Sequence, residues 1–130
     1  MEPSYRYRAT ITRWVDGDTF DATVDLGFRV SSAQRFRLLG YNAPELHADA
    51  PLGRLALAHL EDLLPPGSPV VIRSERGDSF GRWLAEVWPP DGGPALHDRL
   101  IRLGYGVVWD GRGEMPTPWR DWPVYPMAPA

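Results

Sequence analysis

Apolar and polar residues alternate along one stretch in the N-terminal part of the chain, residues 19–26. Its apolar residues all fall on one face: Phe20, Ala22, Val24 and Leu26. Alternation with a period of two residues indicates a β-strand that is buried on one side. Residues 5–15 are also rich in β-forming side chains, and an Asp-Gly-Asp turn signal follows them. The two stretches therefore predict a hairpin with Asp18 at its tip.

The remaining pattern predicts three further strands and two helices. Residues 34–39 form the third strand. Leucine and alanine then recur at helical spacing after Pro51. Because proline is tolerated in the first turn of a helix, a helix can begin there. A Pro-Pro-Gly sequence at residues 65–67 ends this helix. A fourth strand opens at residues 70–72, a fifth spans 82–88, and a second helix spans 95–103.

The order strand-strand-strand-helix-strand-strand-helix is the layout of an OB-type barrel, which carries a helix between its third and fourth strands. We therefore expect an α+β, mainly β fold, a five-stranded OB-fold barrel with two helices. The predicted domain covers residues 1–113. Residues 114–130 contain five prolines together with tryptophan and tyrosine. This composition predicts an extended tail that packs on its own barrel or on a second copy, which would make a homo-oligomer.

The overall composition is that of a soluble globular protein. Hydrophobic residues make up 43% and charged residues 24% of the chain, and no apolar run approaches the roughly 18 residues of a membrane-spanning helix. The polar N-terminus lacks the apolar stretch of a signal peptide. We therefore expect no membrane partner and, by default, a cytoplasmic location.

Two features of the composition restrict the chemistry. The chain has no cysteine, so a metal ion would have to be bound by oxygen atoms or by the three histidines. The spacing of the histidines does not suggest a zinc site. The net charge of −3 is not typical of a protein that coats DNA, although an enzyme that releases its product needs no strongly positive surface.

Three segments place charged side chains where loops and strands meet: residues 16–19, 35–45 and 78–85. Each segment alone has an ordinary explanation, such as a capped turn or a solvated strand face. Together they contain every component that phosphodiester cleavage requires, namely ligands for a hard cation, a base for water and fixed positive charge.

Individual side chains can be matched to these components. Asp18 and Asn42 offer oxygen atoms of the type that calcium accepts. Glu45 offers a base. Arg37 and Arg82 offer planar guanidinium groups, which suit phosphate. The sequence therefore favours a metal-dependent phosphodiesterase.

The three segments resemble those of the staphylococcal (micrococcal) nuclease family. That family carries an Asp-Gly-Asp-Thr hairpin, an Arg-Leu-Leu strand that leads to Asp-(Thr/Ala)-Pro-Glu, and a Tyr/Phe-Gly-Arg turn. The matching positions here are 16–19, 37–45 and 80–82, and the resemblance covers residues 5–110. It implies an OB-type barrel and a calcium-dependent endonuclease that hydrolyses DNA, RNA or both and leaves 3′-phosphate ends.

The resemblance also implies a calcium site. Asp18 matches the first metal ligand, Asn42 falls at the second, and Ala43 would contribute its backbone carbonyl. Asp16 would support these ligands without touching the ion. The amide of Asn42 stands where the best-known member has a carboxylate, so calcium should bind less tightly and other divalent ions become alternatives.

The catalytic groups that the resemblance implies are Glu45 as the general base and Arg37 and Arg82 as the arginines that bind the phosphate. Three aromatic residues are further candidates for contact with the substrate: Tyr41, Phe80 and Trp109. Core packing is an equal alternative for Tyr41 and Trp109. The long C-terminal helix of the family has no counterpart here.

Two other classes of function compete with the enzyme. One is a catalytically silent module of the same fold that binds nucleic acid or protein, and in such modules the arginines and carboxylates are commonly altered together. Four of these residues are all present here: Asp18, Arg37, Glu45 and Arg82. The other is a plain OB-fold binder of single strands, which the net acidity disfavours. We therefore favour the enzyme.

Overall fold

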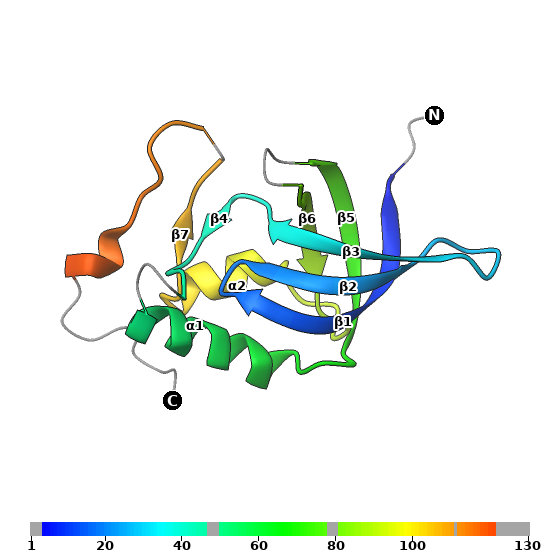
Figure 1. Cartoon of the computed structure of the whole chain (residues 1–130), viewed down its shortest axis with the longest axis horizontal. Helices are drawn as coiled ribbons and strands as arrows, with labels where there is room; N and C mark the ends of the chain where they lie inside the picture. Colours follow the sequence, from blue (N-terminus) through cyan, green and yellow to red (C-terminus); the bar gives the residue numbers. More distant parts are fainter. Residues whose placement is uncertain (1–3, 47–49, 78–80, 111, 122–130) are drawn as a thin grey trace.

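The computed structural model describes residues 4–46, 50–77, 81–110 and 112–121. Five strands close into a barrel, in the order β1-β2-β3-β6-β5 (Figure 1). Their bounds are β1 Arg6–Asp16, β2 Thr19–Asp25, β3 Ser31–Leu38, β5 Pro69–Gly77 and β6 Trp83–Trp88. The β3–β6 pair is parallel, whereas the other neighbouring strands are antiparallel. The structure thus confirms the predicted five-stranded, mainly β barrel.

Two helices complete the predicted order. Helix α1 (Ala50–Leu63) lies between β3 and β5 in the sequence, and helix α2 (Leu96–Arg102) follows β6. The indole nitrogen of Trp14 in β1 donates a hydrogen bond of 2.8 Å to the carbonyl of Leu64, at the end of α1. This buried bond fixes the helix against the barrel.

Apolar side chains fill the barrel, as the alternation predicts for Phe20, Ala22 and Val24, which are all buried. Phe20 contacts two other rings of the core, since its centroid lies 5.1 Å from that of Trp14 and 5.4 Å from that of Phe36. The expectation for Leu26 was wrong: its side chain is 42% exposed. The strand ends one residue earlier, at Asp25.

A second, two-stranded sheet was not predicted. Strand β4 (Tyr41–Asn42) pairs antiparallel with β7 (Val107–Val108). Figure 1 shows this pair at the end of the barrel where β1 turns into β2 and where α1 begins. Strands of two residues carry no readable periodicity, so the hydrophobic pattern gives no signal for them.

The described part of the predicted tail contains a short 3₁₀ turn. Pro118–Asp121 form the 3₁₀ turn η1, and Trp119 within it is only 1% exposed and belongs to the hydrophobic core. The described part of the tail therefore packs on its own barrel, while residues 122–130 lie outside the described residues. No helix among the described residues is both long and apolar enough to cross a membrane.

Removal of the Trp119 side chain should destabilise the barrel. We expect Trp119→Ala to lower the free energy of unfolding by about 3–5 kcal/mol, because a large buried ring leaves a cavity. Chemical denaturation monitored by circular dichroism measures this change. Trp83→Ala is the matched control, because Trp83 is 44% exposed and should cost much less. Equal losses of unfolding free energy in the two variants would contradict the packing of Trp119 in the core.

Candidate functional site

Three polar side chains from different segments meet at the end of the barrel. Asp18 lies in the β1–β2 turn, Arg37 near the end of β3 and Asn42 in β4. The Arg37 Nη1 atom lies 3.4 Å from Asp18 Oδ2, and Arg37 Nη2 donates a 3.0 Å hydrogen bond to Asn42 Oδ1. All three residues are buried, with exposures of 2% for Asp18, 6% for Arg37 and 0% for Asn42. We refer to them as the polar cluster.

Local backbone structure explains this convergence. Thr19 pairs with Arg37 in the β2–β3 ladder, and the Leu38 N–H donates to the Asp18 carbonyl at 2.8 Å. Gly17 allows the hairpin tip to approach both the loop after β4 and helix α1. A Cβ at Gly17 would lie 2.9 Å from the Cβ atoms of Ala43 and Ala56. Close packing around the Asp-Gly-Asp turn therefore requires glycine at position 17.

The Asp18 carboxylate is enclosed by hydrogen-bond donors. Its Oδ1 accepts from the Thr19 hydroxyl at 3.0 Å, and its Oδ2 accepts from the Ala43 N–H at 3.2 Å. Burial raises the pKa of Asp18, although the charge of Arg37 and these hydrogen bonds act in the opposite direction. The buried negative charge therefore depends on its partners, chiefly on Arg37.

Arg37 is held on several sides. Besides Asp18 and Asn42, its Nη2 donates to the Tyr41 carbonyl at 3.3 Å. Its Cζ lies 5.2 Å from the centroid of the Trp109 ring, a cation–π distance. The guanidinium is thus fixed in orientation, which a group that recognises phosphate requires.

Arg82 joins the polar cluster at its edge. Its Nη1 donates to the Thr19 hydroxyl at 3.4 Å, and Thr19 in turn donates to Asp18. The two predicted arginines therefore reach the same hairpin tip, from β3 and from the start of β6. Thr19 links them, and the Asp-Gly-Asp-Thr motif was the available signal for this residue.

The carboxylates of Asp16 and Glu45 lie outside the polar cluster. Asp16 Oδ1 accepts from the Leu46 N–H at 3.0 Å, and this bond fixes the loop that carries Glu45. The Glu45 residue is partly exposed. In the described part of the chain, no hydrogen bond or ion pair links its carboxylate to Asp18 or Arg37.

The three aromatic candidates differ in position. Tyr41 is 1% exposed, and its hydroxyl donates to the Tyr105 carbonyl at 3.1 Å, so it packs in the core. Trp109 is partly buried against Arg37. Phe80 lies outside the described residues. Of the two described candidates, Trp109 is the one whose ring lies beside the polar cluster.

The oxygen atoms of the polar cluster suit a divalent ion in type, but not in their present arrangement. Asp18 Oδ2 and Asn42 Oδ1 both face the guanidinium of Arg37. One negative and one positive charge cancel there, which is unfavourable for a cation. Among the described residues, no group of three or more Asp, Glu or His side chains could hold a metal. An ion between Asp18 and Asn42 would require Arg37 to move.

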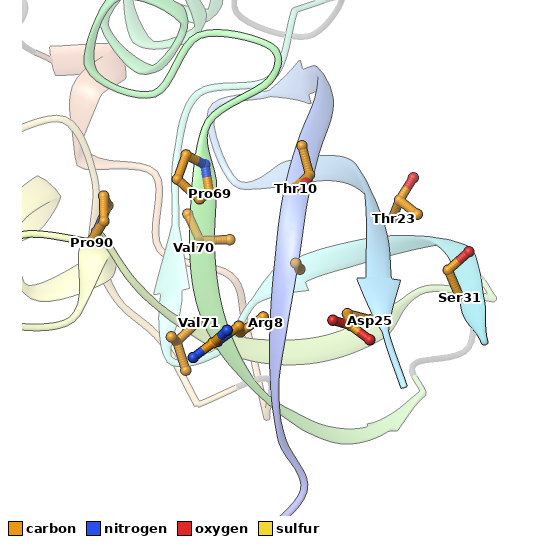
Figure 2. A pocket seen from close by; sticks show the side chains of 10 residues that line it. Arg8, Thr10, Thr23, Asp25, Ser31, Pro69, Val70, Val71 and Pro90 are labelled. Atoms are coloured by element: carbon orange, nitrogen blue, oxygen red, sulfur yellow. The ribbon is translucent and has the colours of Figure 1, made fainter. Parts of the chain in front are cut away.

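A separate pocket lies on the outer face of β1, β2 and β5 (Figure 2). Its lining includes Arg8, Thr23 and Asp25, and none of its lining residues belongs to the polar cluster. Figure 2 shows its labelled side chains spread along the strands. Asp25 is already engaged in a turn, where it accepts from the Gly27 N–H at 2.8 Å. This pocket therefore brings together no catalytic set.

Comparison with known proteins gives one informative similarity. No protein-family model matches the chain. A protein from Escherichia coli O157:H7, named "uncharacterized endonuclease", is 29% identical to this chain over 100 residues. The similar stretch covers 77% of this chain and 60% of that protein. The chain therefore spans about three fifths of the length of this relative.

The buried pair of Asp18 and Arg37 gives a pH-dependent prediction. Arg37→Met should lower the free energy of unfolding by about 3 kcal/mol at pH 7, because it leaves a buried carboxylate without its counter-charge. In this variant the folded-state pKa of Asp18 lies still further above its unfolded value. The penalty is therefore present above the folded pKa and disappears as the pH falls below the unfolded pKa.

Urea denaturation of Arg37→Met and of the wild type at pH 7 and at pH 4 measures this effect. Arg102→Met, on the exposed face of α2, is the control for the loss of one arginine. A stability difference that does not shrink at the lower pH would show that Asp18 does not depend on Arg37.

Proposed function

We propose that this chain is a nuclease that hydrolyses phosphodiester bonds in DNA, RNA or both. The observation that carries the proposal is the polar cluster, in which Asp18, Arg37 and Asn42 meet from three distant segments with Arg82 at the edge. The similarity to a protein named as an endonuclease supports it. The closed five-stranded barrel also agrees with an OB-fold nuclease.

The two arginines would act on the phosphate. Arg37 and Arg82 are tied to neighbouring atoms of the hairpin tip, Asp18 Oδ2 and the Thr19 hydroxyl. Attack on phosphorus gathers negative charge on the non-bridging oxygens. Fixed guanidinium groups bind that charge more strongly than they bind the ground state, and this difference lowers the barrier.

Glu45 would act as the general base. Its loop is fixed by the bond from Leu46 N–H to Asp16, and its side chain is open to solvent in part. A carboxylate at this position can take a proton from a water that attacks phosphorus from the side opposite the leaving group.

We further propose a divalent ion of the calcium type as activator. Asp18, Asn42 and the Ala43 carbonyl are its candidate ligands, and they could hold it only if Arg37 released the oxygens of Asp18 and Asn42. Such an ion would supply positive charge to the phosphate and would make a bound water more acidic. With these residues, the chain would belong to the staphylococcal nuclease family, whose products carry 3′-phosphates.

One observation favours a second candidate, a catalytically silent module that binds nucleic acid or protein. The guanidinium of Arg37 is already bonded to Asp18, Asn42 and the Tyr41 carbonyl. If that arrangement never opens, the residues of the polar cluster stabilise the barrel and do not contact a substrate.

Cleavage of labelled single-stranded DNA and RNA by the purified protein distinguishes the two. With millimolar calcium we expect cutting that a chelator abolishes, with products ending in 3′-phosphate. Glu45→Gln should be slower by about 100-fold or more, because it loses the base but keeps the shape. Glu61→Gln, on the exposed face of α1, is the control and should cut like the wild type.

Two results would contradict the proposed nuclease. One is a wild-type protein that binds nucleic acid but never cuts it with calcium, magnesium or manganese. The other is a Glu45→Gln variant as fast as the control, which would remove Glu45 from the chemistry.

A further inference from the structure

The side-chain amide of Asn42 is bonded at both of its ends. Its Oδ1 accepts from Arg37 Nη2 at 3.0 Å, and its Nδ2 donates to the Pro116 carbonyl at 3.1 Å. A guanidinium can only donate and a carbonyl can only accept. The partners therefore determine which end of the amide is oxygen and which is nitrogen.

Pro116 belongs to a segment that follows β7 and returns to the barrel. We call the described residues 107–110 and 112–119 the C-terminal arm. At its start, β7 pairs with β4, and Gly106 just before it packs so closely on Tyr41 that no Cβ would fit there. At its other end, Trp119 is buried in the core. Figure 1 shows the arm leaving β7 and ending in η1.

The arm makes a second contact with the polar cluster through Trp109, whose ring lies 5.2 Å from Arg37 Cζ. The Trp109 backbone N–H donates to the Gly40 carbonyl at 3.1 Å, and its indole nitrogen donates to the Arg112 carbonyl at 3.0 Å. The ring is therefore fixed relative to both the arm and the β3–β4 turn. Arg37 is held by Asn42 and by Trp109 together.

We propose that the C-terminal arm positions Arg37 for phosphate, and that Asn42 is the positioning residue that connects the two. The proposal rests on the proposed nuclease function. It gives a physical reason for an amide at this position. An aspartate could still accept from Arg37, but it could not donate to the Pro116 carbonyl and would set two acceptors against each other.

Asn42→Asp tests the proposal because it removes the donor to the Pro116 carbonyl and keeps the shape of the side chain, while the negative charge that it adds is matched by the control. We expect amide hydrogen exchange in residues 107–119 to become at least 10-fold faster. We also expect kcat for single-stranded DNA to fall at least 10-fold with KM within about twofold, since the loss concerns transition-state contacts. Gln34→Glu is the matched control, because it adds the same charge at an exposed site and keeps the acceptor for Trp83 Nε1.

A second pair of variants tests whether the effect passes through Arg37. In an Arg37→Lys background, Asn42→Asp should change kcat by less than twofold, because the positioned group is already altered. Trp109→Leu removes the ring and its bond to the Arg112 carbonyl, and keeps the backbone bond to Gly40. It should lower kcat in the wild-type background. This variant therefore still tests the positioning of Arg37 if Asn42→Asp does not fold.

Each contrary result is distinct. Unchanged amide hydrogen exchange in the C-terminal arm of Asn42→Asp would show that Asn42 does not hold the arm. A rise in kcat for Asn42→Asp would show that Asn42 acts through the proposed metal ion and would overturn its role in positioning Arg37. Independent effects of the two substitutions on kcat would overturn positioning through Arg37. A wild-type protein that cuts nothing would overturn the nuclease, while hydrogen exchange would still decide whether Asn42 holds the arm.

Discussion

The structure depends on a buried charge that is compensated by one partner. Asp18 is almost fully enclosed, and burial opposes its ionisation, so the Arg37 guanidinium at 3.4 Å is its main stabilising contact. Arg37 in turn connects to Asn42, to the Tyr41 carbonyl and to the Trp109 ring. The hairpin tip, the β3–β4 turn and the C-terminal arm are thereby joined through a single side chain. Buried carboxylates with a perturbed pKa and a specific charge partner cluster at functional sites, which makes this point a candidate for chemistry.

The barrel provides the rigidity for this arrangement. Its strands pair in a closed order, so each side chain of the polar cluster is placed by a ladder or a short turn. The two arginines arrive from different segments and meet at Thr19 and Asp18, and Asp16 of the same hairpin fixes the loop that carries Glu45. Arg37 would have to leave Asp18 and Asn42 before these oxygens could hold a cation.

Much of this arrangement could be predicted from the sequence. Period-two alternation and a turn signal located the hairpin, and the three charged segments predicted that Asp18, Arg37, Asn42, Glu45 and Arg82 share one site. Among the described residues, bonds join four of these, Arg82 through Thr19, and no such bond joins the Glu45 carboxylate to Asp18 or Arg37. The β4–β7 pair could not be predicted, because two residues carry no periodicity. The bond from Asn42 to Pro116 could not be predicted either, because any residue can supply a backbone carbonyl. The proline-rich composition suggested a tail, but composition alone could not reveal that Trp119 enters the core.

The most direct test of the central claim is the single-turnover cleavage rate of Asp18→Asn against that of the wild type. The substitution preserves the shape of the side chain and removes its charge at the centre of the polar cluster. We expect a folded variant, judged by its circular dichroism spectrum, that cuts single-stranded DNA about 100-fold more slowly or worse. A folded Asp18→Asn protein that cuts at the wild-type rate would show that the polar cluster is a structural feature and not the catalytic site.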